Sequence, residues 1–213
     1  MDFYSFFNSS TSYRIRIVLA LKKVDFNLNP VNIRVMEHKA QDYVRKNPAA
    51  NVPLLVDDNG FELGQSMAIA DYLDTRFPEP RLIPDNLEKR ARVLEVANLI
   101  SCDMHPLNNL RVLRYLVKEL GVSDEQKNTW YHHWIAEGFQ SLEALLERAD
   151  SGNYCFDNQV SLADCCLVPQ VANALRMKCD LTPYPRVLKV YEHCISLPEF
   201  KAAAPAVQPD YQP

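Results

Sequence analysis

Four consecutive hydroxyl side chains, Ser9, Ser10, Thr11 and Ser12, stand directly before a segment with helical spacing near the start of the chain. The first turn of a helix has N–H groups without intrahelical partners, and the helix dipole makes this end positive. One hydroxyl is enough to cap a helix, which is worth about 1 kcal/mol. The other hydroxyls could donate hydrogen bonds to an anion such as a thiolate and lower the pKa of its thiol. The spacing therefore fits both a redundant N-cap and a thiolate site.

Any thiol chemistry at this segment must come from a bound molecule, because no cysteine precedes Cys102. The chain has six cysteines and no C-x-x-C pair, so their spacing predicts neither a metal site nor a redox motif. A reducing cytosol keeps such thiols free, and we expect most of them to be small buried side chains.

Two further segments could bind parts of the same ligand. Val52-Pro53 opens an apolar run typical of a strand, and a cis bond there would turn the backbone groups of Val52 outward, toward an extended peptide. Gln65-Ser66 precedes a helical segment and could form a second anion site. The simpler interpretations are an edge strand opened by proline and a helix cap at Ser66. Two anion sites beside a strand edge would suit a short anionic peptide.

The second half of the chain offers polar groups with less specific spacing. The segment 102–111 surrounds a proline, and a solvated loop is its simpler interpretation. Arg176 ends an apolar run and could be only a helix C-terminal charge. Ser161 and Asp164 have the spacing of a capping box, which predicts a structural role for Asp164.

Strand and helix periodicities alternate over the first part of the chain. They predict the order β-α-β-α-β-β-α, which forms a mixed sheet with helices on its faces. Asn59-Gly60 is a turn signal and marks a hairpin. The expected strands span residues 1–7, 26–31, 53–56 and 61–63, and the expected helices span 12–23, 38–44 and 67–77.

A proline-rich connection at 77–84 marks the expected domain boundary. Beyond it, apolar residues recur at three- and four-residue spacing, which is typical of helices. We expect an α/β domain at 1–80 and an all-helical domain at 87–213. Its helices are expected at 90–99, 108–119, 124–148, 161–177 and 185–197, with the proline-rich tail 204–213 along the surface.

The composition is that of an ordinary globular protein, with 47% hydrophobic and 23% charged residues. The net charge of −4 argues against a broad basic surface for nucleic acid. No apolar run approaches the ~18 residues that a membrane span needs, and the N-terminus lacks a secretory signal. We therefore expect a cytoplasmic protein.

Taken together and in this order, these segments resemble the cytosolic glutathione transferases, and within them the zeta class, which includes maleylacetoacetate and maleylpyruvate isomerases. The resemblance covers nearly the whole chain. Its most specific parts are the serine-rich start and the end of the helical half. The segment QSMAIADYL, in contrast, is shared widely across transferase classes. The matching segments are SSTSYRIRIVLALK, NPAANVPLL, LGQSMAIADYL, RFPEPRLIP, CDMHPLNNLRVL, SLADCCLVPQVANALR and DLTPYPRV.

The resemblance implies a thioredoxin-like α/β N-terminal domain, an all-α C-terminal domain and a homodimer. It also implies glutathione as the cofactor, a small-molecule diacid as the substrate, and neither nucleic acid nor membrane as a partner. Glutathione would lie along a cis Val52–Pro53 edge, with its γ-glutamyl carboxylate at Gln65-Ser66.

The resemblance also assigns individual side chains. It implies that Ser9 stabilises the thiolate, with Ser10 and Thr11 as neighbouring catalytic hydroxyls, and that His38 contacts the glycyl end of glutathione. The further glutathione contacts that it implies are Asp103, His105 and Asn109.

The chain departs from the family at two positions of this site. Asn8 stands where the family usually has an arginine that faces a substrate carboxylate, and Thr11 stands where it commonly has a cysteine. Arg176 matches the other carboxylate-binding arginine, and Arg111 matches an arginine of the maleylpyruvate-type isomerases. An amide cannot replace a bidentate charged contact, so the choice of diacid stays open at Asn8.

The expected function is glutathione-dependent cis–trans isomerisation of maleylacetoacetate or maleylpyruvate to the fumaryl isomer, in the catabolism of aromatic compounds. An alternative that keeps glutathione is conjugation of small electrophiles or dehalogenation of α-haloacids. A third reading is a non-catalytic binding module with the transferase fold. Loss of glutathione binding would favour this third reading.

Overall fold

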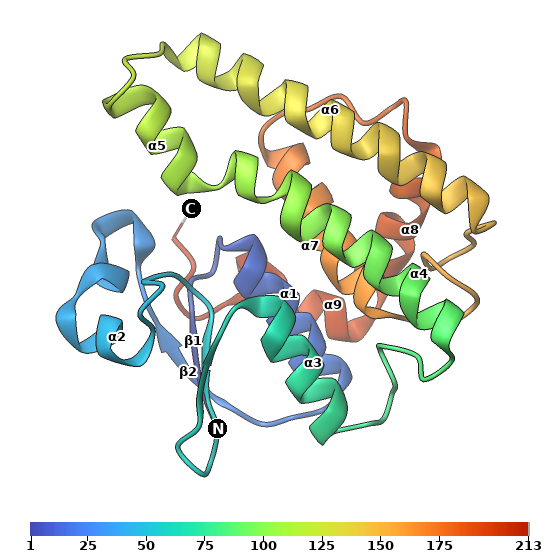
Figure 1. Cartoon of the computed structure of the whole chain (residues 1–213), viewed down its shortest axis with the longest axis horizontal. Helices are drawn as coiled ribbons and strands as arrows, with labels where there is room; N and C mark the ends of the chain where they lie inside the picture. Colours follow the sequence, from blue (N-terminus) through green and yellow to red (C-terminus); the bar gives the residue numbers. More distant parts are fainter. Residues whose placement is uncertain (213) are drawn as a thin grey trace. The chain divides into compact units, whose positions relative to one another are not determined.

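The computed structural model describes residues 1–212, which pack as two units (Figure 1). The first unit comprises Met1–Leu82 and the segment from Ile195 onward, and the second comprises Ile83–Cys194. The expected division assigned every residue from 87 to 213 to one helical domain. The segment from Ile195 instead packs with the first unit because its helix α9 (Pro198–Ala203) lies against α1 (Ser10–Leu21).

A four-stranded mixed sheet forms the centre of the first unit. Its strands are β1 (Asp2–Ser5), β2 (Asn27–Pro30), β3 (Leu54–Val56) and β4 (Glu62–Gly64). Their order across the sheet is β2-β1-β3-β4, with β1 and β2 parallel and the other neighbours antiparallel. The predicted mixed sheet and its hairpin are therefore confirmed, although β1, β2 and β3 are shorter than expected and β4 is shifted by one residue.

Helices cover this sheet and connect its strands. α1 packs against α3 (Ser66–Arg76) as well as α9. The helix expected at 38–44 is interrupted, since Ala40 has an extended backbone (ψ 141°) after the 3-10 turn Glu37–Lys39. The α-helical part, α2, begins only at Gln41 and spans Gln41–Lys46.

Alternation along β1 places side chains on both faces of the sheet. Phe3 is fully buried, whereas Tyr4 packs on a second apolar cluster. This cluster consists of Phe6, Phe7, Val31, Tyr43, Val52 and Leu54. The segments before α1 and before β3 are therefore packed together, and both carry expected site residues.

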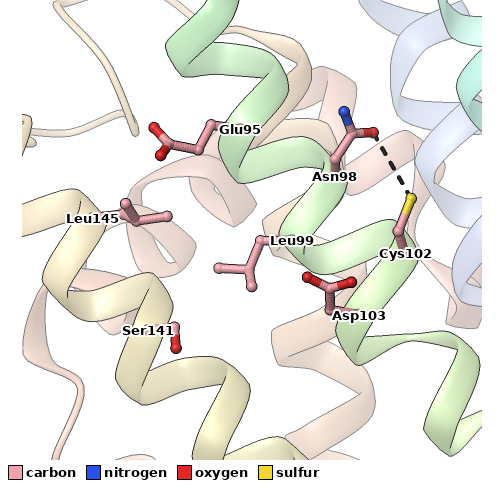
Figure 2. Close-up of a pocket in the computed structure, with 7 residues that line it drawn as sticks. All are labelled: Glu95, Asn98, Leu99, Cys102, Asp103, Ser141 and Leu145. Atoms are coloured by element: carbon pink, nitrogen blue, oxygen red, sulfur yellow. Dashed lines mark hydrogen bonds between the residues drawn. The ribbon is translucent and has the colours of Figure 1, made fainter.

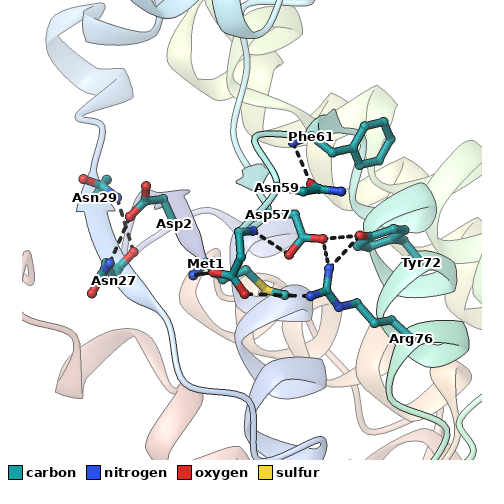
Figure 3. A network of polar contacts seen from close by, with 10 residues as sticks. Met1, Asp2, Asn27, Asn29, Asp57, Asn59, Phe61, Tyr72 and Arg76 are labelled. Atoms are coloured by element: carbon teal, nitrogen blue, oxygen red, sulfur yellow. Dashed lines mark hydrogen bonds and ion pairs between the residues drawn. The ribbon is translucent and has the colours of Figure 1, made fainter.

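A polar network holds the far end of α3 to the β3–β4 turn (Figure 3). The buried Asp57 carboxylate accepts from the Tyr72 hydroxyl and pairs with Arg76, both on α3. Asp58 in the same turn pairs with Arg76 and with the N-terminal ammonium of Met1. These contacts fix the orientation of the helix whose first residue is Ser66.

The second unit is helical throughout, as the sequence predicts. Its long helices are α4 (Leu87–Asn98), α5 (Leu110–Lys118), α6 (Asp124–Arg148), α7 (Leu162–Arg176) and α8 (Pro185–Ser196), the last of which ends two residues beyond the unit boundary at Cys194. α4 packs against α7, and α5 against α6. Together with the mixed sheet of the first unit, this confirms the predicted fold class.

The polar segment 102–111 is more helical than expected. α4 runs on into a π-helical turn, Leu99–Met104, and a 3-10 turn, Pro106–Asn108. α5 starts at Leu110 because the Asn109 side chain caps it, accepting from the Arg111 N–H at 3.1 Å. The interpretation as a solvated loop is therefore wrong for most of this segment.

The capping box before α7 is confirmed. The fully buried Asp164 carboxylate accepts from the N–H and the hydroxyl of Ser161, each at 2.8 Å, and from the Cys155 N–H at 2.8 Å. Burial raises the pKa of Asp164, while these hydrogen bonds lower it. Asp164 thus organises the start of α7, as the sequence predicts.

Candidate active site

The start of α1 is capped by Ser9. Its backbone is extended, its carbonyl accepts the first intrahelical bond from the Tyr13 N–H at 2.8 Å, and its Oγ accepts from the Ser12 N–H at 3.2 Å. The helix expected at 12–23 therefore begins earlier, at Ser10, and Ser12 lies within its first turn. Ser12 is fully buried, and its Oγ accepts from the Phe6 N–H at 3.5 Å.

The hydroxyls of Ser9 and Thr11 form a directed chain. Thr11 Oγ1 donates to the Val52 carbonyl at 3.0 Å, and the oxygens of Ser9 and Thr11 are 2.9 Å apart. A hydroxyl has one proton to donate, so in this arrangement Ser9 donates to Thr11. The α1 cap is thereby linked through two side chains to the residue before Pro53.

Ser10 differs from both neighbours. Its half-exposed side chain makes no hydrogen bond to any residue between Met1 and Gln212. Its hydroxyl proton is therefore available to a ligand without breaking a contact of the chain. Ser9 would have to release Thr11 before it could donate to a ligand.

The Val52–Pro53 peptide bond is cis, as the resemblance implies. The Val52 carbonyl accepts from Thr11, whereas its N–H makes no hydrogen bond within the part of the chain that the structure describes. Buried backbone N–H groups without a partner are rare in proteins. This N–H fits the backbone of an extended peptide ligand.

Side chains that the sequence did not single out form hydrogen bonds to the turn that leads to Val52. The Asn51 carbonyl accepts from the Asn47 amide at 2.7 Å and from the Tyr43 hydroxyl at 2.6 Å. Burial raises the pKa of Tyr43 to about 12. A Cβ at Gly64 would lie 3.1 Å from Asn47 Oδ1, so glycine allows this close packing.

The start of α3 has no side-chain cap. Gln65 occupies the N-cap position with a φ of 65°, an uncommon left-handed conformation for a residue other than glycine, and its side chain caps nothing. Ser66 was expected to cap this helix, which is wrong, because it is the first helical residue. Its buried Oγ accepts from Arg14 Nη1 at 2.8 Å. The uncapped N–H groups leave this helix start suited to an anion.

The loop between β1 and Ser9 is held from two sides. From within, the buried Arg16 guanidinium donates to the carbonyls of Phe6, Phe7 and Ala203 and to the Ser5 hydroxyl. Burial lowers its pKa to about 10.

From the C-terminal tail, the Asp210 carboxylate accepts from the Phe7 N–H at 2.9 Å, and the Tyr211 ring packs edge-on against the Phe7 ring. The sequence does carry a signal for the buried role of Arg16, because this arginine stands among the apolar residues of a helix. Nothing in the local sequence marks Asp210. Residues 204–212 of the proline-rich tail form no α-helix and are mostly accessible to solvent, as expected.

Two other expected site residues of the first unit are partly accessible to solvent. Asn8 is half-buried directly before Ser9. His38 is half-buried in the 3-10 turn Glu37–Lys39.

In the second unit, His105 and Asn109 meet. Asn109 Nδ2 lies 3.3 Å from His105 Nε2, while Asn109 Oδ1 caps α5 through the Arg111 N–H. Arg111 is exposed in the first turn of α5. The structure therefore brings together three of the expected residues of this unit.

Asp103 lies elsewhere in the second unit. It lines a cavity of about 400 Å³ between α4 with its π-helical extension and α6 (Figure 2). The lining side chains are Glu95, Asn98, Leu99, Cys102, Asp103, Ser141 and Leu145. The two carboxylates suit a cationic group of a ligand, such as an ammonium, better than a carboxylate.

Arg176 is exposed at the end of α7, where it donates to Asn173 Oδ1. Next to this helix end, His132 on α6 lies 2.9 Å from the Met177 carbonyl. The adjacent Tyr131 hydroxyl is buried and has no hydrogen-bond partner among residues 1–212, and burial raises its pKa. The sequence did not single out Tyr131, because its place in the helical spacing is that of an ordinary core residue.

The cysteines are mostly buried, as expected, with Cys102 exposed and Cys179 half-buried. Within residues 1–212, no three His, Cys, Asp or Glu side chains come together as they would around a metal ion. No helix in this range combines the length and apolarity of a membrane span.

Comparisons with known proteins place this geometry in a family. The family model for the glutathione S-transferase N-terminal domain matches residues 1–75. A probable maleylacetoacetate isomerase of Vibrio cholerae is 44% identical over 97% of this chain and 96% of its own length. The solved structure of a maleylpyruvate isomerase, described as a bacterial zeta-class glutathione transferase, has a TM-score of 0.96 and 42% identity, with both chains fully covered. This chain belongs to the zeta class of the glutathione transferases.

A third relative carries ligands. The structure of a maleylacetoacetate isomerase from Methylobacterium extorquens AM1, with malonate and glutathione bound, is 30% identical, has a TM-score of 0.93 and matches over the full length of both chains. In the present zeta-class chain, the orphan Val52 N–H and the uncapped start of α3 have the donor groups that a peptide carboxylate and backbone require. The residues present therefore fit glutathione.

Proposed function

We propose that this transferase is a glutathione-dependent isomerase that converts a maleyl diacid to its fumaryl isomer in the catabolism of aromatic compounds. The observation that carries the proposal is the start of α1, where the unpartnered Ser10 hydroxyl stands beside the Ser9–Thr11–Val52 chain. Relatives named as maleylacetoacetate or maleylpyruvate isomerases support it, and so does the relative that binds glutathione together with malonate, a small diacid.

Glutathione, when bound, supplies a thiolate nucleophile that adds reversibly to a conjugated double bond and so permits rotation about it. The task of this chain is to stabilise the thiolate. Ser10 donates a hydrogen bond to it directly, the dipole of α1 adds positive potential, and Ser9 keeps the helix start in place.

The proposal assigns glutathione contacts in each unit. In the first unit, Val52 pairs with the peptide backbone, Gln65 and Ser66 receive the γ-glutamyl carboxylate, and His38 contacts the glycyl end. In the second unit, the proposed contacts are Asp103, His105 and Asn109.

Binding of the diacid requires cations, because the substrate carries two carboxylates and negative charge develops during the reaction. We assign this role to Arg176 and Arg111, whose exposed guanidinium groups stand at helix ends. A guanidinium binds a carboxylate through two parallel hydrogen bonds. Asn8 adds an amide where an arginine is usual, so these two arginines carry the charge.

The test is loss of maleylpyruvate and maleylacetone absorbance with and without glutathione. We expect turnover of at least one of them that depends on glutathione and falls when Ser10 is replaced by alanine. No turnover of either, with glutathione still bound in calorimetry, would overturn the isomerase proposal. No binding of glutathione would overturn the whole assignment and favour a non-catalytic module.

A second candidate keeps glutathione and changes the substrate. The observation that favours it is Asn8, an uncharged amide that is half-buried next to the Ser9 cap, at the position where the family resemblance implies an arginine. A site with fewer cations suits small electrophiles or α-haloacids better than diacids. Faster turnover of chloroacetate or dichloroacetate than of maleylpyruvate would select this candidate.

Oligomeric state and location complete the proposal. We assign a homodimer in the cytoplasm, as the resemblance to zeta-class transferases implies. Light scattering of the purified protein tests the dimer, since a mass equal to the 24.4 kDa of one chain would contradict it.

A further inference from the structure

The side chain of Arg14 is buried in α1 with very little to neutralise it. It is 2% exposed, and it is one of the largest buried side chains of the molecule. Its one hydrogen bond within residues 1–212 is from Nη1 to Ser66 Oγ, at 2.8 Å. Its Nε has no partner, and no carboxylate of the described chain forms an ion pair with it.

Two other buried cations, Arg16 within α1 and Lys22 at its C-cap, have the contacts typical of a structural role. Arg16 donates to three carbonyls and a hydroxyl. Lys22 pairs with the buried Asp74 carboxylate and donates to the Pro80 carbonyl. A buried charge without a counter-ion is costly, and proteins normally pair it. Arg14 is therefore an exception among the buried cations of α1.

The hydrogen bond from Arg14 determines what Ser66 can do. Because Ser66 Oγ accepts from the guanidinium, its own proton points to another acceptor. Ser66 is also the first residue of α3, whose N-terminal N–H groups have no side-chain cap. A carboxylate at this helix start would accept from the Ser66 hydroxyl and from backbone N–H groups, one hydroxyl away from the Arg14 charge.

We infer that Arg14 is a positioning residue for the carboxylate of the γ-glutamyl end of glutathione, acting through Ser66. The ligand supplies the negative charge that the protein does not provide. This inference rests on the proposed function. It adds to that function a buried residue, Arg14, that supplies positive charge to the carboxylate site.

The test compares two ligands on matched variants. One ligand is glutathione, and the other is 4-aminobutanoyl-cysteinylglycine, which is glutathione without the γ-glutamyl α-carboxylate. The variants are Arg14→Met, which removes the charge, and Arg14→Lys, which keeps it. The control Arg45→Met removes a charge from the exposed surface of α2. Calorimetry gives the Kd of each ligand, and thermal unfolding reports on folding.

The wild type should bind glutathione at least about tenfold more tightly than the analogue, as expected for a charge-assisted contact. Arg14→Met should lose most of this discrimination, because the substitution weakens the binding of glutathione and leaves the Kd of the analogue nearly unchanged. Arg14→Lys should keep part of it, and Arg45→Met all of it.

Several results would overturn the inference. Equal weakening of both ligands in Arg14→Met would mean that Arg14 only supports the fold, and unchanged discrimination would mean that it does not reach the ligand. If Arg14→Met fails to fold, a cycle of Arg14→Lys and Ser66→Ala decides. Additive effects on the Kd of glutathione would contradict a relay through Ser66, and non-additive effects would support it. A wild type that binds no glutathione would instead defeat the proposed function itself.

Discussion

The hydroxyls at the start of α1 and the arginines at the ends of α5 and α7 are held in place to very different degrees. Ser9 and Thr11 are bonded to one another and to the backbone, and Ser66 is bonded to the buried Arg14. Arg111 and Arg176, in contrast, are exposed, and within residues 1–212 the Arg176 guanidinium is held only by Asn173 on its own helix.

This difference agrees with what we propose that each region recognises, glutathione in the first unit and the diacid in the second. A cofactor that never changes is best met by groups whose positions are set before binding, because less entropy is then lost on association. Substrates that differ in shape are better met by long flexible side chains. The first unit therefore holds pre-organised donors, and the second holds adaptable cations.

The largest effect should come from removing the proposed thiolate donor, Ser10, together with the helix cap, Ser9. We expect the double variant Ser9→Ala/Ser10→Ala to lose about 10²–10³-fold in kcat, as for other oxyanion-type donors. The single variants separate the two roles. Ser9→Ala should also lower stability by about 1 kcal/mol through loss of the cap, whereas Ser10→Ala should leave Tm unchanged. An active Ser10→Ala enzyme with a normal thiol pKa of bound glutathione would refute the role of Ser10.

The next largest effect tests the flexible side of the contrast. Arg176→Ala should lower kcat/KM for a maleyl diacid about 100-fold through loss of a bidentate contact, and leave the Kd of glutathione unchanged. Its Tm should not move, because the side chain is exposed. Arg148→Ala, another exposed arginine of the second unit, is the control. Full turnover with unchanged KM in Arg176→Ala would remove this residue from the assignment.

A smaller effect is expected at the bond between Thr11 and Val52. Thr11→Val keeps the shape and removes the hydroxyl, so Ser9 loses its acceptor and Val52 its donor. We expect the Kd of glutathione to rise about tenfold, while Thr11→Ser stays near wild type. The spectroscopic pKa of the bound thiol should shift in Thr11→Val as well. Identical behaviour of the two variants would show that the hydroxyl chain is incidental.

The smallest effect should come from the tail. Asp210→Ala leaves the Phe7 N–H without its acceptor and should cost about 1 kcal/mol of stability. Asp210→Asn keeps an acceptor oxygen and serves as the control. We expect KM for glutathione to rise by about threefold or less. A stability loss in Asp210→Asn equal to that in Asp210→Ala would mean that the charge near Arg16, and not the hydrogen bond, is what matters.

The sequence by itself determined the class of the fold and the family. Periodicity follows from which face of an element is buried, so the alternation in β1 and the helical spacing from Leu87 onward predicted the mixed sheet and the helical unit. The family resemblance supplied the cis Val52–Pro53 edge, which the structure confirms. Local side-chain chemistry was enough for the Ser161–Asp164 capping box, since its partners are three residues apart.

The tertiary structure decided the details that depend on partners far along the chain. Four hydroxyls in a row cannot reveal which one is the cap, because this depends on where the first turn begins. Arg14 and Ser66 are 52 residues apart, and Phe7 and Asp210 are 203 apart. Such pairs leave no local pattern, because only packing of α1 against α3 and α9 brings them within hydrogen-bond distance.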